Sequence, residues 1–115
     1  MSGATPDITP NSAVMEMARL SRQLDELGHR LKSAEREAVD TEHAYRVAKA
    51  KALLAVTDGT VPEREAQALL KVEAERLAAK TAEANLRILR SDIRIAKNRI
   101  DVGRSVVGVL RMEAS

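Results

Sequence analysis

The strongest constraint on the fold is a run of small and apolar residues spaced alternately three and four apart between residues 79 and 110. The members of this run, here called the C-terminal seam, are Ala79, Ala82, Leu86, Leu89, Ile93, Ala96, Ile100, Gly103, Val107 and Leu110. An average spacing of 3.5 residues places all of them along one side of an α-helix that packs against another helix. The pattern predicts one long helix over about residues 62–112.

The same alternation occupies the first half of the chain. Its members, the N-terminal seam, are Ala13, Met17, Leu20, Leu24, Leu27, Leu31, Ala34, Ala38, Thr41, Tyr45, Ala48, Ala52 and Ala55. Thr9 with Pro10 suits an N-cap followed by a first-turn proline, and Ser12 is a second candidate cap. These features predict a helix over about residues 12–57, preceded by a disordered tail at residues 1–11.

The segment TDGTVPE separates the two patterns. Gly59 suits a left-handed helix C-cap, Thr60 and Glu63 have the spacing of a capping box, and Pro62 fits a first helical turn. A turn at residues 58–61 follows. Because the loop is short, we expect an all-α, coiled-coil-like antiparallel two-helix hairpin over residues 12–112, with residue i opposite about residue 118 − i.

A further apolar row lies outside the C-terminal seam. This outer row consists of Ile88, Ile95, Val102 and Val109, seven residues apart. Val106 belongs to a stretch for which the first helix offers no partner. One hairpin leaves this surface uncovered, so we expect a homo-oligomer, with two hairpins forming a helical bundle. The predicted interface is Ile88, Ile95, Val102, Val106 and Val109.

Composition argues against a catalytic domain. The 115 residues include a single aromatic residue and no cysteine, and the net charge is +2. His29 and His43 lie about 21 Å apart along one helix, too far to share a metal. No glycine-rich phosphate loop follows a strand. We therefore expect no enzyme activity, no cofactor, no metal and no membrane partner, and a cytoplasmic protein without a signal peptide.

Basic residues follow one edge of the predicted second helix. This basic stripe consists of Arg87, Arg90, Arg94, Lys97 and Arg104, and Asp101 interrupts it. Such a stripe can bind nucleic-acid phosphates. It can equally be a solvated edge whose long side chains cover the neighbouring seam. The pattern does not decide between the two, so DNA is one candidate partner.

From about residue 44 onward, the chain reads AYRVAKAKALL, then GTVPEREAQALL, then a final helix that ends in IDVGRSVVGVLR. In these segments it resembles small helical bacteriophage proteins encoded among genes for DNA replication and recombination, near single-strand annealing recombinases. The resemblance implies a non-enzymatic accessory protein in the host cytoplasm, with a phage or host DNA-metabolism protein as partner. A direct nucleic-acid-binding protein and a virion structural or assembly protein are the alternatives.

Overall fold

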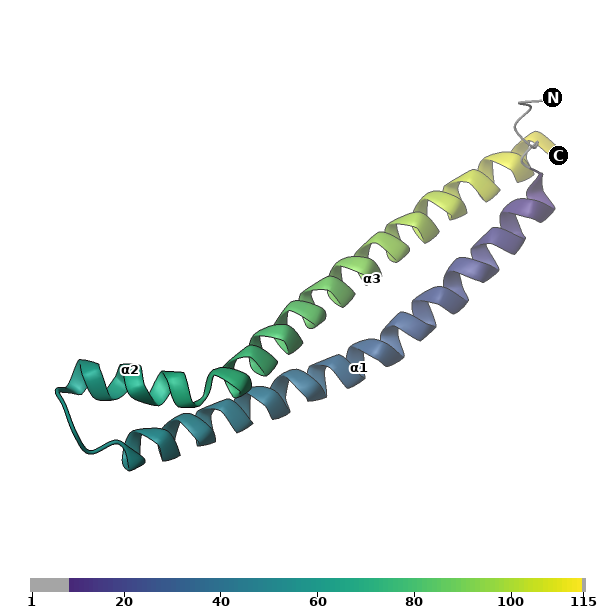
Figure 1. The fold of residues 1–115 in the computed structure, drawn as a ribbon. Helices are drawn as coiled ribbons and strands as arrows, with labels where there is room; N and C mark the ends of the chain where they lie inside the picture. Colours follow the sequence, from purple (N-terminus) through teal and green to yellow (C-terminus); the bar gives the residue numbers. More distant parts are fainter. Residues whose placement is uncertain (1–8, 115) are drawn as a thin grey trace, which may run out of the picture. The chain divides into compact units, whose positions relative to one another are not determined.

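The structure, a computed structural model, describes residues 9–114, and over this range it contains helices and no strand (Figure 1). The helices are α1 (Pro10–Ala55), α2 (Val61–Lys71) and α3 (Glu73–Ala114). The predicted all-α class is confirmed. The described residues form two compact units: unit 1 combines residues 9–29 and 90–114, and unit 2 is residues 30–89.

Helix α1 begins with a reciprocal cap. The Ser12 backbone N–H donates to Thr9 Oγ1 (3.1 Å), and the Thr9 backbone N–H donates to Ser12 Oγ (3.0 Å). The two predicted cap candidates thus act together, and they satisfy backbone groups that a helix end otherwise leaves unpaired. The helix starts at Pro10, two residues before the predicted start. The rest of the predicted tail, residues 1–8, lies outside the described residues.

The connection between α1 and α2 combines a confirmed cap and a corrected one. Thr60 is the N-cap of α2, and its Oγ1 accepts a hydrogen bond from the Glu63 N–H (3.3 Å). Gly59 has a φ of 101°, the left-handed backbone expected of it. However, α1 ends at Ala55 and not near residue 57, so Gly59 lies within the loop and does not cap the helix.

The predicted single second helix is wrong, because the chain is interrupted at Val72. This residue leaves the helical region (φ −112°, ψ 22°), and its N–H donates to Leu69 O at 3.3 Å, a three-residue spacing. No proline or glycine marks the position. Ala68 and Val72 are the two least exposed core residues in the described chain, at 0% and 3%. Tertiary packing, and not a local breaker, therefore accounts for the interruption.

Burial along the helices follows the predicted seams. Every member of the N-terminal seam from Ala13 to Ala52 is buried or half-buried, and Ala55 alone is exposed. Every member of the C-terminal seam is likewise buried or half-buried. The alternation of three and four residues thus identified the packed side of both long helices correctly.

The pairing register differs from the predicted one by about two residues. In unit 2, Ala52 shares a buried cluster with Ala68, and in unit 1 the side chain of Met17 lies against Gly103. Both pairs place residue i opposite about residue 120 − i. The reason lies in α2, where Ala68 is the first buried residue, whereas burial in α1 continues to Ala52 and into the loop at Val56. The packed residues of α2 therefore begin further from the loop than those of α1 end, and this difference shifts the pairing register.

Candidate interaction surfaces

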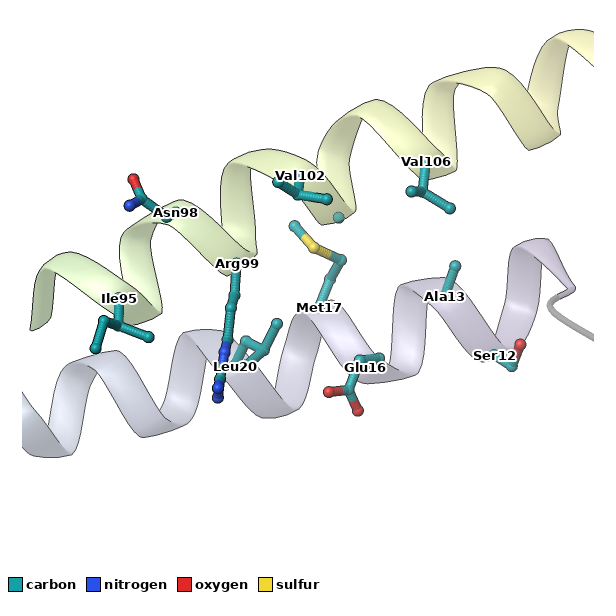
Figure 2. Close-up of a pocket in the computed structure, with 11 residues that line it drawn as sticks. Ser12, Ala13, Glu16, Met17, Leu20, Ile95, Asn98, Arg99, Val102 and Val106 are labelled. Atoms are coloured by element: carbon teal, nitrogen blue, oxygen red, sulfur yellow. The ribbon is translucent and has the colours of Figure 1, made fainter. Parts of the chain in front are cut away.

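Unit 1 contains an apolar groove of about 630 Å³ between the first turns of α1 and the second half of α3 (Figure 2). Its lining residues are Ser12, Ala13, Glu16, Met17, Leu20, Ile95, Asn98, Arg99, Val102, Gly103 and Val106. Figure 2 shows Met17 pointing from α1 toward α3, and Arg99 and Val106 pointing from α3 toward α1. The surface that these residues leave open is mainly aliphatic, which favours an apolar ligand.

A glycine shapes the floor of this groove. A Cβ at Gly103 would collide with Met17 Sδ, so the absence of a side chain lets the thioether lie against the α3 backbone. Methionine is suited to this position because its unbranched side chain adapts to irregular space. Met17 and Gly103 are both members of the predicted seams. The groove thus borders the packed side of the helices.

Charged residues border the groove at one edge. The Arg19 guanidinium donates hydrogen bonds to both carboxylate oxygens of Glu16, and the distance from Nε to Oε2 is 2.9 Å. This hydrogen bond is the main reason that the pKa of Glu16 lies below its ordinary value, and the charges of Arg19 and Arg99 lower the pKa further. Arg99 itself has no hydrogen-bond or ion-pair partner within residues 9–114.

The predicted interface residues are exposed. Ile95, Val102, Val106 and Val109 belong to unit 1, with exposed fractions between 36% and 64%. Ile95, Val102 and Val106 line the groove, whereas Val109 does not. Ile88, 58% exposed, belongs to unit 2. The outer row is therefore available to a partner, as an interface would require.

The basic stripe is also exposed. Arg90, Arg94, Lys97 and Arg104 belong to unit 1, and Arg87 belongs to unit 2. Arg104 Nη1 lies 3.9 Å from Asp101 Oδ1, so the acidic residue that interrupts the stripe partly neutralises its last member. Among the described ion pairs, none involves the other four residues of the stripe.

Sequence reasoning missed the α1 side of the groove. It assigned Met17 and Leu20 to the helix seam, and no pattern in α1 alone marks these residues or Glu16 as a binding site. Leu20 is in fact buried at 4% while still lining the groove. The signal that was available is Gly103 within the C-terminal seam, because a packed position without a side chain lets a residue of the facing helix, here Met17, approach the backbone.

Unit 2 has a different kind of hollow. A cavity of about 580 Å³ is lined by Ala38, Glu42, Tyr45, Arg76, Ala79, Lys80 and Glu83. Nearby, Arg76 is held by Glu73 at 2.8 Å, and this hydrogen bond raises the pKa of the guanidinium. Glu75, at a position that continues the C-terminal seam backward, has a buried Oε2 without a hydrogen-bond partner.

Within the part of the chain that the structure describes, no three acidic, histidine or cysteine side chains gather closely enough to hold a metal ion. Over the same residues, none of the helices combines the length and the apolar character of a membrane span. Comparison with protein-family models, with curated proteins and with solved structures finds no match to this chain.

Proposed function

We propose that this protein is a non-enzymatic helical interaction protein that self-associates through the exposed apolar surface of α3. The chain would form an antiparallel hairpin, and two hairpins would combine into a helical bundle. The observation that carries the proposal is the apolar groove of unit 1 with Ile95 and Val102 at its edge, 46% and 64% exposed.

The physical support is the cost of leaving this surface in water. Burying an aliphatic side chain completely is worth about 1.5–3 kcal/mol relative to leaving it exposed. Several such side chains gathered beside one groove mark an interaction site more strongly than the same number scattered singly. A helix from a partner, with aliphatic residues at three- and four-residue spacing, matches the apolar chemistry of this groove.

Light scattering at micromolar concentration tests the proposal. The wild-type protein should have the mass of a dimer or a larger oligomer. The double variant Ile95→Glu, Val102→Glu should shift toward monomer, because each carboxylate would be buried in an apolar interface. The matched control is Val39→Glu, Leu77→Glu, which adds the same charge at two apolar residues of unit 2 that are 68% and 60% exposed. A wild-type monomer at high concentration would contradict self-association.

We propose phage DNA replication or recombination in the host cytoplasm as the setting, with a phage or host DNA-metabolism protein as a partner. This part rests on the resemblance of the segments from residue 44 onward to small helical phage proteins. Pull-down of the tagged protein from infected cells should enrich proteins that act on DNA. Recovery of the protein from purified virions would instead favour the structural or assembly alternative.

Direct binding of nucleic acid is the second candidate, because Arg90, Arg94 and Lys97 are exposed and have no ion-pair partner among the described residues. If they contact duplex phosphates, Arg90→Gln and Arg94→Gln together should weaken binding similarly for all DNA sequences. The slope of log K against log salt should flatten by about 0.9 for each lost contact. The control Glu73→Gln lies in unit 2. Absence of DNA binding by the wild-type protein near physiological salt would exclude this candidate.

A further inference from the structure

We infer that the partner of unit 1 is a second copy of this chain, with the two α3 helices antiparallel and Ile95 near the twofold axis. The inference rests on the self-association proposed above and specifies its geometry. The face of α3 that carries the outer row has few charges between residues 91 and 109. Its members are Ser91, Asp92, Ile95, Asn98, Arg99, Val102, Ser105, Val106 and Val109. Depletion of charge is typical of the centre of a protein interface.

The two charges on this face are opposite in sign and lie on either side of Ile95. Asp92 precedes Ile95 by three residues, and Arg99 follows it by four. Both are exposed, and neither has an ion-pair or hydrogen-bond partner among the described residues. They cannot pair within the chain, because seven residues of helix separate their Cα atoms by about 10 Å along the axis.

A twofold axis near Ile95 would bring the two charges together between the two copies. It exchanges the two ends of the α3 segment, so that Asp92 of each copy lies opposite Arg99 of the other. Two equivalent ion pairs then flank a central contact between the two Ile95 side chains. The same surface is used by both copies, as an isologous interface requires. One arrangement thus covers the exposed Ile95 and gives Asp92 and Arg99 ion-pair partners, while Arg99 also acts through its charge on Glu16 within unit 1.

Charge also selects against the parallel arrangement. In a parallel pair related by a twofold axis, residues 92 and 99 of the two copies would lie on opposite sides of the interface, so neither ion pair could form. Basic residues of the opposite edge, Arg90, Arg94 and Lys97, lie outside the charge-poor face. They remain in solvent when the two outer rows meet.

Charge exchange tests the register. Asp92→Arg alone places arginines opposite arginines, and Arg99→Asp alone places aspartates opposite aspartates. Each should raise the dimer dissociation constant about tenfold or more, and the double variant Asp92→Arg, Arg99→Asp should restore it. The matched controls are Glu83→Arg and Arg90→Asp, which make comparable charge changes in α3 outside residues 91–109. They should leave the dissociation constant within about twofold, as expected for exposed charges outside an interface.

A single introduced thiol gives a second measurement, because the chain contains no cysteine. Ile95→Cys should form a disulfide-linked dimer under mild oxidation, whereas Val109→Cys, far from the axis, should not. Equal cross-linking of both variants, or single charge variants that dimerise like the wild type, would overturn the antiparallel register while leaving self-association intact. A monomeric wild-type protein would overturn both proposals. Circular dichroism of each variant checks that the helices persist.

Discussion

The two units bury side chains of different size around hollows of different chemistry. The buried apolar residues of unit 2 are Ala52, Val56, Ala68, Val72, Ala79, Ala82 and Leu89, whereas those of unit 1 are Leu20, Leu27, Ala96 and Ile100. The cavity of unit 2 described above is bordered by charged side chains such as Glu42 and Lys80. The groove of unit 1 is mainly aliphatic.

The difference in side-chain size and in the chemistry of the hollows indicates which unit has a surface suited to a partner. Small residues allow helix axes to approach toward the close end of the roughly 8–10 Å range, and charged side chains around the remaining hollow are solvated by water. Larger residues hold helices further apart, and exposed aliphatic side chains beside the gap gain free energy only when something covers them. Unit 1 combines the mainly aliphatic groove with exposed aliphatic side chains of α3, and this is the surface on which the proposed self-association rests.

The largest effect should come from removing a large residue of unit 1. Leu20→Ala should destabilise the protein by about 2–4 kcal/mol, because Leu20 is 4% exposed and the loss of buried methyl groups leaves a cavity. Leu24→Ala should lower the free energy of unfolding by less, because Leu24 is only half-buried. Urea unfolding at one fixed protein concentration measures both, since self-association links stability to concentration. A larger loss at Leu24 would contradict the assignment of the core.

The next effect comes from adding volume to unit 2. Ala68→Leu should destabilise the protein by about 1–3 kcal/mol, because Ala68 is 0% exposed and the surrounding core has no room for three more carbon atoms. Ala38→Leu is the control, since Ala38 is half-buried and borders the cavity beside Tyr45. Its effect should be smaller. Equal melting temperatures for Ala68→Leu and the wild type would show that unit 2 is packed loosely.

A smaller effect concerns the floor of the groove. Gly103→Ala should gain roughly 0.5–1 kcal/mol of helix stability only when Met17 is already alanine. With Met17 present, the new Cβ competes for the position of its sulfur, and the gain should be reduced or lost. A double-mutant cycle on thermal or urea unfolding measures this coupling. Additive effects would mean that Met17 moves aside without cost.

The smallest effect is electrostatic. Because the hydrogen bond from Arg19 is the main cause of the lowered pKa of Glu16, Arg19→Gln should raise that pKa toward its ordinary value of 4.5. Arg99→Gln should raise it less, since Arg99 acts only through its charge. Carboxyl NMR titration follows both variants. Because the pKa of Glu16 is lower in the folded state, its ionised form stabilises the fold at pH values above the unfolded-state pKa. This stabilisation is lost as the pH falls through the folded-state pKa. Both groups are exposed, so stability should change little.

The sequence by itself determined the all-α class and the packed sides of the long helices. The alternation of three and four residues identified both seams, because a helix can bury only the positions that recur along one side. Thr9, Ser12 and Thr60 were found as caps, since capping depends on a few neighbouring residues. The resemblance to phage proteins, the outer row as an interface and the basic stripe as a phosphate site stay predictions.

Only the tertiary structure decided the interruption at Val72, the register of the packed pairs and the groove. Each depends on residues far apart in the chain: Ala68 with Ala52, and Met17 with Gly103. Local helix propensity does not determine which side chains of two helices will be in contact. Shifting the pairing register by two residues leaves the hydrogen bonds within each helix unchanged. The groove is lined by residues of both helices, and the close approach of Met17 to Gly103 within it is a property of the pair and of neither residue alone.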